Sequence, residues 1–134
     1  MDTSKEYINM CDCPEIQEKK VAIRNKDNFV QVEIGKRVYY VWLPRQDDIQ
    51  EILSEKLFAG LFVLDNTDIG ARLSYMTGRF KDFVHTKCEK MIPLEKNRAR
   101  IEYLFTSMEQ LWLAFYMYEK HRKTWDGEKW LKKQ

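Results

Sequence analysis

The sequence has few of the residues on which catalytic and metal sites depend. It contains two histidines, three cysteines and five glycines among 134 residues. Three cysteines are an odd number and too few for a disulfide framework, so we expect reduced thiols. Neither a glycine-rich phosphate loop nor a nucleophile elbow is present. These absences predict a protein that is not an enzyme and that carries no cofactor.

Long apolar runs are also missing. The run Leu111–Tyr118 has eight apolar or aromatic residues, whereas a membrane-spanning helix needs about 18 or more. The opening stretch MDTSKEYINM is polar and mixed in charge, and it has no apolar segment typical of a signal peptide. We therefore expect no membrane association and a cytoplasmic location.

The residues that are present suit a packed globular protein. Hydrophobic residues make up 44% of the chain, charged residues 33% and aromatic residues 13%. This balance supports one domain, 1–134, with a substantial core. The net charge is +2, but residues 1–68 carry nine Lys/Arg against thirteen Asp/Glu, and residues 69–134 carry fourteen against eight. Such asymmetry is typical of an anion-binding half, of self-association between unlike halves, or of scattered surface charge.

Local patterns predict an α+β fold. Two β-rich runs flank Gly35-Lys36 in NFVQVEIGKRVYYVW, which indicates a hairpin at 29–42. Apolar residues at helical spacing predict helices near 46–57 and 68–86. Thr3 or Ser4 caps a short first helix, and Pro14 begins a second. Shorter patterns indicate a strand at 99–105 and another in FAGLFVLDN. We expect a small antiparallel sheet packed against three or four helices.

A further helix is predicted near 107–122. Ser107 is a candidate N-cap and Gln110 follows three residues later, as in a capping box. The helix is apolar on nearly every side, so it is expected to be central and to bury Trp112 and Phe115. Tyr116 and Tyr118 are the residues expected to reach a surface, because their hydroxyl groups need a partner or water.

Four residues could in principle bind zinc: Cys11, Cys13, His85 and Cys88. His85 and Cys88 would share a helix face, but the single residue between Cys11 and Cys13 is shorter than the usual spacing of a zinc pair. Isolated cysteines also serve as small hydrophobic residues. We therefore predict no metal site, and we leave open whether these four residues come together.

Basic and aromatic residues supply the better candidates for a binding site. Cations attract phosphate and aromatic rings stack on bases, although no motif with fixed spacing is present. At the turn after YYVWLP, polar residues follow an aromatic strand, a common place for a binding site. The residues proposed to bind a ligand or partner are Arg45, Gln46, Arg79, Arg98, Arg100, Tyr116, Tyr118, Arg122 and Trp125.

Three stretches resemble a group of small uncharacterised bacteriophage and prophage proteins. These are TSKEYINMCDCPEIQ, VWLPRQDDIQEIL and FTSMEQLWLAFYMYEKHRKTWDGEKWLK. The resemblance implies a phage accessory protein in the cytoplasm of a bacterial host, without enzymatic activity, that binds and neutralises a host factor. That factor would be a defence protein or a nucleotide signal. The alternative is a nucleic-acid-binding module that uses the basic C-terminal half.

Overall fold

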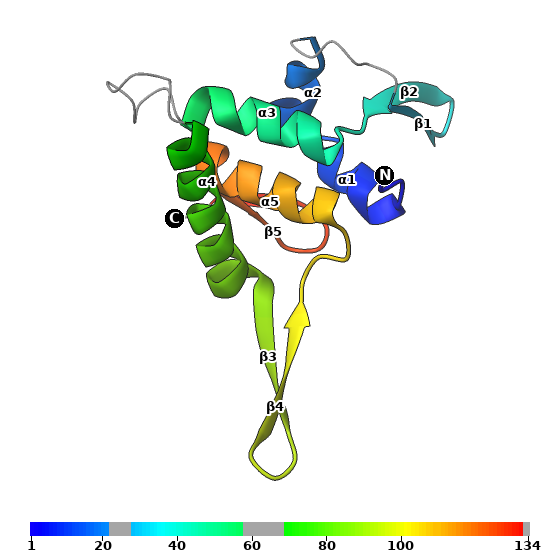
Figure 1. Cartoon of the computed structure of the whole chain (residues 1–134). Helices are drawn as coiled ribbons and strands as arrows, with labels where there is room; N and C mark the ends of the chain where they lie inside the picture. The colour runs from blue at the N-terminus through cyan, green and yellow to red at the C-terminus, as the bar shows by residue number, and fades with distance from the viewer. Residues whose placement is uncertain (22–27, 58–68, 133–134) are drawn as a thin grey trace. The chain divides into compact units, whose positions relative to one another are not determined.

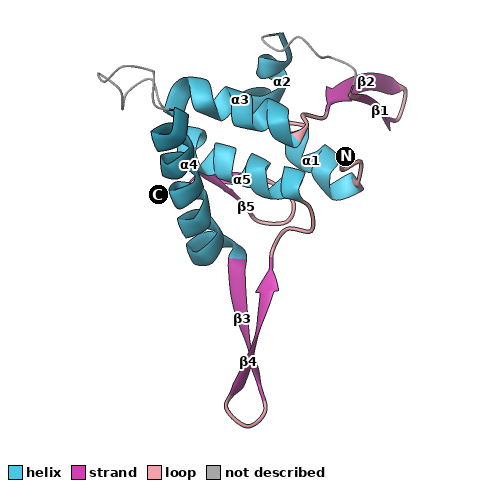
Figure 2. Cartoon of the chain, viewed as in Figure 1, coloured by secondary structure: helices cyan, strands magenta, loops and turns pink. Residues whose placement is uncertain are grey.

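The computed structural model describes residues 1–21, 28–57 and 69–132 (Figure 1). Within these ranges the α+β prediction is confirmed, with five α-helices and three separate two-stranded antiparallel sheets (Figure 2). The chain forms two compact units. Met1–Ile52 and Ser107–Gln134 make the terminal unit, and Leu53–Thr106 make the inserted unit. The predicted strand in FAGLFVLDN lies outside the described residues, and the extent of a single domain stays a prediction.

Two short helices open the terminal unit. α1 spans Lys5–Cys11, and the Ser4 hydroxyl caps it by accepting a hydrogen bond from the Tyr7 N–H at 3.2 Å. α2 spans Pro14–Gln17 and continues as a 3-10 turn, η1, at Glu18–Val21. Pro14 occupies the first position, where its missing N–H costs no hydrogen bond. Both helices were predicted from these caps.

The predicted hairpin at 29–42 is confirmed as β1, Phe29–Ile34, and β2, Arg37–Trp42. Its strands pair from Phe29 with Trp42 to Ile34 with Arg37. Gly35 has a φ of 61°, a left-handed conformation that glycine adopts without strain. Only the end of β2 enters the core, because Val41 and Trp42 are buried while most of the hairpin is exposed. α3 follows at Gln46–Leu57, as predicted.

Gln17 joins α1, α2 and β2 through its side-chain amide. Its Nε2 donates to the backbone carbonyls of Cys11 at 2.9 Å and Trp42 at 3.0 Å. Its Oε1 accepts from the Trp42 N–H at 3.0 Å. The amide therefore satisfies both backbone groups of Trp42, whose side chain is fully buried. Such pairing matters because an unsatisfied buried polar group costs about 1–3 kcal/mol.

α5, Met108–His121, is the central helix, as its all-round apolar pattern predicted. Seven of its residues are buried, and Trp112 and Phe115 pack edge to face with ring centroids 5.9 Å apart. The expectation that Tyr116 reaches a surface is wrong, because its side chain is 1% exposed. Its hydroxyl lies 3.4 Å from Nε2 of His121, which is the polar partner that this hydroxyl needs. Across the described ranges, no helix is both long and apolar enough to cross a membrane.

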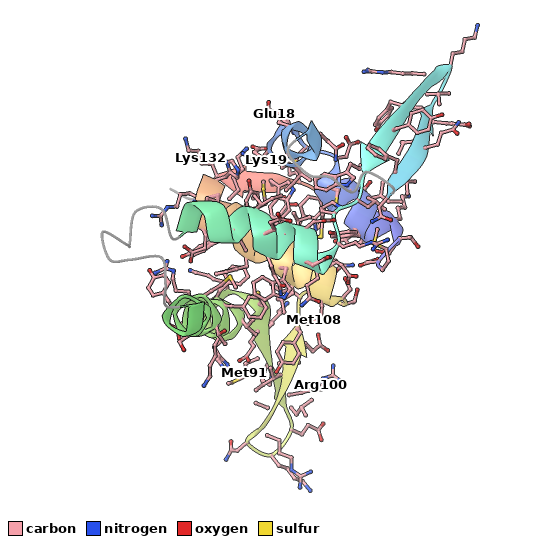
Figure 3. The ribbon with its side chains drawn as sticks, turned by 45° about the horizontal axis from the view of Figure 1, so that its top comes forward. Glu18, Lys19, Met91, Arg100, Met108 and Lys132 are labelled. Carbon is pink, nitrogen blue, oxygen red and sulfur yellow. The ribbon has the colours of Figure 1, made fainter. Side chains whose placement is uncertain are left out.

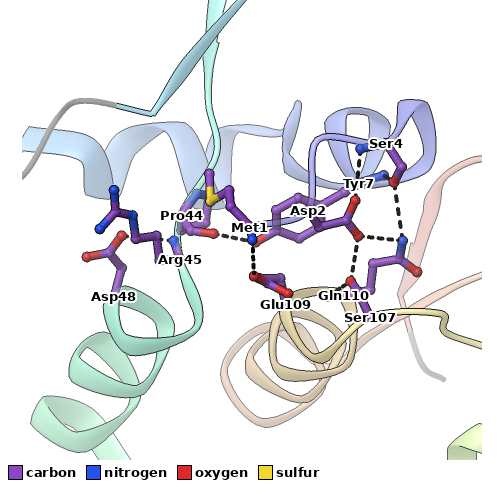
Figure 4. Close-up of polar contacts among 10 residues, drawn as sticks. All are labelled: Met1, Asp2, Ser4, Tyr7, Pro44, Arg45, Asp48, Ser107, Glu109 and Gln110. Carbon is purple, nitrogen blue, oxygen red and sulfur yellow. Dashed lines mark hydrogen bonds and ion pairs between the residues drawn. The ribbon is translucent and has the colours of Figure 1, made fainter.

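A polar cluster ties the N-terminal segment to the start of α5 (Figure 4). The Ser107 hydroxyl caps α5 by accepting from the Gln110 N–H at 3.1 Å, and it also donates to the Asp2 carboxylate. The Gln110 side-chain amide donates to the same carboxylate at 2.8 Å. Burial raises the pKa of Asp2, but hydrogen bonds from Ser107, Ser4 and Gln110 outweigh it and lower the pKa below 3.8.

The inserted unit contains α4, Ile69–Phe83, a π-helical turn, η2, at Val84–Cys88, and a hairpin. The predicted helix at 68–86 is thus confirmed, with its last turn widened. The hairpin consists of β3, Glu89–Leu94, and β4, Arg98–Tyr103. β4 matches the predicted strand, whereas β3 was not predicted. Lys96 and Asn97 have positive φ values of 62° and 61° and close the turn between the strands.

Replacing Gln17 by alanine is expected to destabilise the terminal unit by about 2–4 kcal/mol. It removes the partner of both Trp42 backbone groups and one of the two donors to the Cys11 carbonyl, which keeps the Cys13 N–H at 2.8 Å. Urea unfolding followed by circular dichroism measures this loss. Gln31→Ala is the matched control, because Gln31 is exposed and bonds only to the exposed Glu33 in the described structure. Equal unfolding midpoints for the two variants would contradict the role given to Gln17.

Stability is also expected to fall at acid pH through Asp2. Because its folded pKa lies below the ordinary value of 3.8, its contribution is complete above that value and is lost as pH falls through the folded pKa. Asp2→Asn should therefore be less stable than the native chain at pH 7, and the difference should shrink as the pH falls below 3.8. Unfolding midpoints at several pH values test this. Glu18→Gln, at an exposed position, is the control. Its unfolding midpoint should change with pH in the same way as that of the native chain.

Candidate functional site

A cleft of about 330 Å³ lies in the terminal unit between the α1–α2 connection and a C-terminal hairpin. The hairpin consists of β5, Lys123–Trp125, and β6, Trp130–Lys132. One wall comes from the first connection and the other from the hairpin and its turn. The lining residues are Asn9, Asp12, Cys13, Pro14 and Glu15 on the first wall, and Lys123, Trp125, Glu128, Lys129 and Trp130 on the second.

The first wall forms where α1 stops. Asp12 is the C-cap, and its N–H donates to the Ile8 carbonyl at 3.0 Å. Cys13 is then extended, with a φ of −145°, because the residue before a proline avoids the helical conformation. Tyr39 of β2 donates from its hydroxyl to the Asp12 carboxylate at 2.7 Å, and this bond raises the pKa of Tyr39. The carboxylate of Asp12 is thereby held at the cleft.

The second wall forms where α5 ends. Arg122 adopts the left-handed conformation, with a φ of 54°, and its N–H donates to the Met117 carbonyl. The chain then reverses into β5. At the hairpin turn, the Asp126 carboxylate accepts from the N–H groups of Glu128 and Lys129, both at 2.8 Å. Gly127 provides the positive φ of 106° that the turn needs.

Two tryptophans give the second wall its aromatic surface. Trp125 and Trp130 are cross-strand partners, and their ring centroids lie 5.0 Å apart with the planes tilted by 58°. Aromatic pairs at this separation attract each other in tilted or edge-to-face arrangements. The two rings thus form one fixed aromatic unit beside the carboxylates of the first wall.

Three side chains bind the hairpin to the first helices. The Trp125 indole N–H donates to Glu6 at 2.7 Å, and the Trp130 indole N–H donates to the Met10 carbonyl at 2.9 Å. Lys123 forms an ion pair with Glu15. Burial raises the pKa of Glu15, but the hydrogen bond and charge of Lys123 outweigh it, so the pKa is lowered and the carboxylate stays charged.

Cys13 supplies the one thiol among the described lining residues. Burial, and to a smaller extent the charge of Glu15, raise the pKa of its thiol to about 12. Its Sγ lies 3.7 Å from the Met10 carbonyl, which accepts a weak hydrogen bond from the thiol. At neutral pH the residue is protonated, and the thiol form is neither a nucleophile nor a zinc ligand. The described lining residues also include no histidine that could activate it.

The turn proposed as a site around Arg45 and Gln46 serves as the start of α3. The Arg45 N–H donates to the Asp48 carboxylate at 2.9 Å (Figure 4). The Ile49 N–H donates to the Arg45 carbonyl at 3.1 Å. Arg45 is exposed and Gln46 is half-buried. The helix end already holds a carboxylate, which argues against an anion site at this position.

The other proposed residues are distributed over both units. In the terminal unit Tyr118 is half-buried, Arg122 is the exposed cap of α5, and Trp125 lines the cleft. In the inserted unit Arg79 lies on α4, 5.7 Å from the Tyr75 ring centroid. Arg98 and Arg100 lie on β4, and Arg100 pairs with Glu102. Of the nine predicted binding residues, only Trp125 belongs to the cleft.

Within each unit by itself, the cysteines and His85 are not grouped with other metal ligands among the described residues. Cys11 is fully buried in the terminal unit, and burial raises its pKa. Cys88 is fully buried in the inserted unit, where burial raises its pKa to about 12. His85 is exposed and its Nδ1 lies 2.8 Å from the Glu89 carboxylate. Among the residues that the structure describes, no three His, Cys, Asp or Glu side chains are grouped as metal ligands.

Sequence reasoning did not identify most of the cleft. Glu15 and Lys123 are 108 positions apart in the chain, and no local pattern pairs them. The stretch KTWDGEKWLK contains a signal for a hairpin: KTW before the turn is mirrored by WLK after it, and the turn itself contains Asp-Gly. That symmetry places both tryptophans on one face, because cross-strand partners share a face.

Comparison of the chain with protein-family models, with curated proteins and with solved structures finds no match.

The thiols of the folded chain are expected to react slowly. With a pKa of about 12, Cys13 has a thiolate fraction of about one in ten thousand at pH 8, whereas an ordinary cysteine has roughly a quarter. Iodoacetamide at pH 8 should label the native chain at least about a hundredfold more slowly than the chain in guanidinium chloride. Peptide mass spectrometry assigns the labelled positions. Rapid labelling of Cys13 in the native chain would contradict its protonated state.

Proposed function

We propose that this chain is a non-enzymatic binding protein whose cleft receives a cationic side chain from a partner protein. The observation that supports it best is the position of the Trp125–Trp130 pair beside Asp12, Glu15 and Glu128. A guanidinium or ammonium group is attracted both by the face of an indole ring and by a carboxylate. In the setting implied by the resemblance to phage and prophage proteins, the partner would be a bacterial host protein, such as a defence protein.

The charges of the cleft favour a cation over a nucleotide. Its lining carries three carboxylates and two ammonium groups. Lys123 is already paired with Glu15, which leaves the carboxylates of Asp12 and Glu128 against the ammonium group of Lys129. A nucleotide would bring phosphate groups next to this excess of negative charge. Of the two host factors that the sequence suggested, the structure therefore supports a protein better than a nucleotide signal.

Enzymatic activity is less well supported. The thiol of Cys13 is protonated at neutral pH, and the other lining residues provide no nucleophile paired with a base. The tryptophans are fixed by their own hydrogen bonds to Glu6 and Met10. A rigid aromatic surface of this kind suits binding, because little conformational entropy is lost when a partner docks.

A nucleic-acid-binding module is the second proposal. It is favoured by Lys90, Arg98 and Arg100, which lie on one face of the β3–β4 hairpin. The fold weakens the charge argument, however. The terminal unit carries fourteen Lys/Arg and fourteen Asp/Glu, and the inserted unit carries nine and seven. The strong asymmetry between the halves of the sequence is therefore reduced once both ends of the chain fold into one unit.

Reversing the charges of two adjacent residues distinguishes a cationic partner from a nucleotide. Glu128→Lys should weaken binding of a blocked hexapeptide with two arginines about threefold to tenfold, and Lys129→Glu should strengthen it similarly. Both side chains are exposed, and the turn is held by backbone groups of these two residues: their N–H groups and the Lys129 carbonyl. Tryptophan fluorescence reports the binding, because Trp42 and Trp112 are 0% and 7% exposed and the responsive rings are Trp125 and Trp130.

ATP titrated under the same conditions is the comparison ligand. If ATP binds and the two reversals act in the opposite directions, the cleft is a nucleotide site and the proposal fails. The proposal also fails if neither reversal changes peptide binding. Lys36→Glu, at the exposed turn of the β1–β2 hairpin, is the control for a general change in charge.

A further inference from the structure

The β3–β4 hairpin of the inserted unit has one mainly apolar face, on which Glu89 is the one charged residue. Its other face carries Lys90, Arg98, Arg100 and Glu102 beside Ile92 and Leu94. Its register pairs Met91 with Ile101 and Pro93 with Ala99 on one side. Tyr103 continues this side, because it is two residues beyond Ile101 on β4. Met91, Ile101 and Tyr103 are 70%, 50% and 60% exposed. An apolar face of this extent, on a hairpin of only two strands, is the kind of surface that another chain covers.

The opposite face carries most of the charges. Here Lys90 is paired with Glu102, and Ile92 with Arg100. Figure 3 labels Met91 and Arg100, one on each strand of this hairpin. In strand order, β4 therefore presents Arg100 and Glu102 on the charged face, with Ile101 between them on the apolar face.

β4 also has an edge open to further pairing. In the described structure β4 pairs with β3 alone, so its second edge has backbone groups that no strand occupies. β3 carries Pro93, which removes an N–H and discourages pairing at its outer edge. β4 has no proline, and its pairing with β3 is regular over all six of its residues, Arg98 to Tyr103. Natural proteins usually block such an edge unless another strand occupies it.

The geometry points to a second copy of this chain as the occupant, through antiparallel pairing of β4 with β4. When Ile101 of each copy faces the other, Arg100 of each chain faces Glu102 of its partner. Ala99 likewise faces Tyr103, which keeps the apolar residues together. Opposite charges across a strand pair are favourable, and a two-fold axis forms both ion pairs at once.

This register is set by the order of the charges. A shift that brought Arg100 opposite itself would place two like charges at the centre of the pair, which is unfavourable. In the favoured register, the two hairpins make one four-stranded sheet whose apolar face is continuous. Four strands with such a face satisfy the requirement for a stable sheet that one hairpin does not meet. This pairing involves the inserted unit alone and is independent of the cleft and of its ligand.

Charge reversals in the full chain test this pairing. Arg100→Glu gives an acidic variant and Glu102→Arg a basic one, and each alone should weaken self-association about tenfold or more, since both symmetric ion pairs become repulsive. Mixing the two variants should restore the dimer, because every acidic position then faces a basic one. The double variant Arg100→Glu/Glu102→Arg should also dimerise. Sedimentation equilibrium measures the affinities, and native mass spectrometry identifies the mixed dimer by its mass.

The mixed dimer distinguishes a loss of pairing between chains from a loss of stability within one chain. Each single variant loses the ion pair between Arg100 and Glu102 within its own chain, but only pairing between chains lets one variant rescue the other. Lys36→Glu should leave self-association unchanged. A native chain that is monomeric at millimolar concentration would overturn the inference. Single variants that dimerise as well as the native chain, or a mixture that stays monomeric, would overturn it as well.

Discussion

The carboxamide of Gln17 holds together three segments of the terminal unit. It binds the last turn of α1 through Cys11 and both backbone groups of Trp42 at the end of β2. The seven residues from Cys11 to Gln17 are thereby fixed at both ends. Four of the five residues of the first wall, Asp12 to Glu15, lie between them. The second wall depends on this frame in turn, because Trp130 donates to Met10 and Lys123 pairs with Glu15. The geometry of both walls therefore depends on the hydrogen bonds of Gln17.

Elements that carry their own local signals were predictable from the sequence. Ser107 and Gln110 mark the start of α5. The Ser107 hydroxyl accepts a hydrogen bond from the Gln110 N–H three residues later, which is the spacing of an N-cap. The β1–β2 hairpin was equally clear, since two β-rich runs flank Gly35. β3 was not, because EKMIPL combines charges with a proline and has no alternating pattern. It is a strand because the turn at Lys96 and Asn97 brings it against β4, whose residues supply its hydrogen-bond partners.

The candidate site was less predictable than the fold. Basic and aromatic residues were selected for their chemistry, yet a side chain is useful only where the fold leaves it accessible. Tyr116 was predicted to reach a surface through its hydroxyl group, but it is buried, and burial raises its pKa to about 12. Arg45 was chosen for its place at a turn and serves to start a helix. Trp125 was identified, but its partners Trp130 and Glu15 come from positions that no local rule connects to it.

The terminal unit is built from both ends of the chain, and this has a consequence for its biosynthesis. Glu15 and Asp2 leave the ribosome long before Lys123 and Ser107, their partners, have been made. At about 5–20 residues per second, the 108 positions between Glu15 and Lys123 take roughly 5–20 s to translate. During that interval Tyr7 and Met10, which become fully buried, have no α5 to pack against. This unit therefore cannot complete its packing until α5 and the hairpin that follows it have been translated.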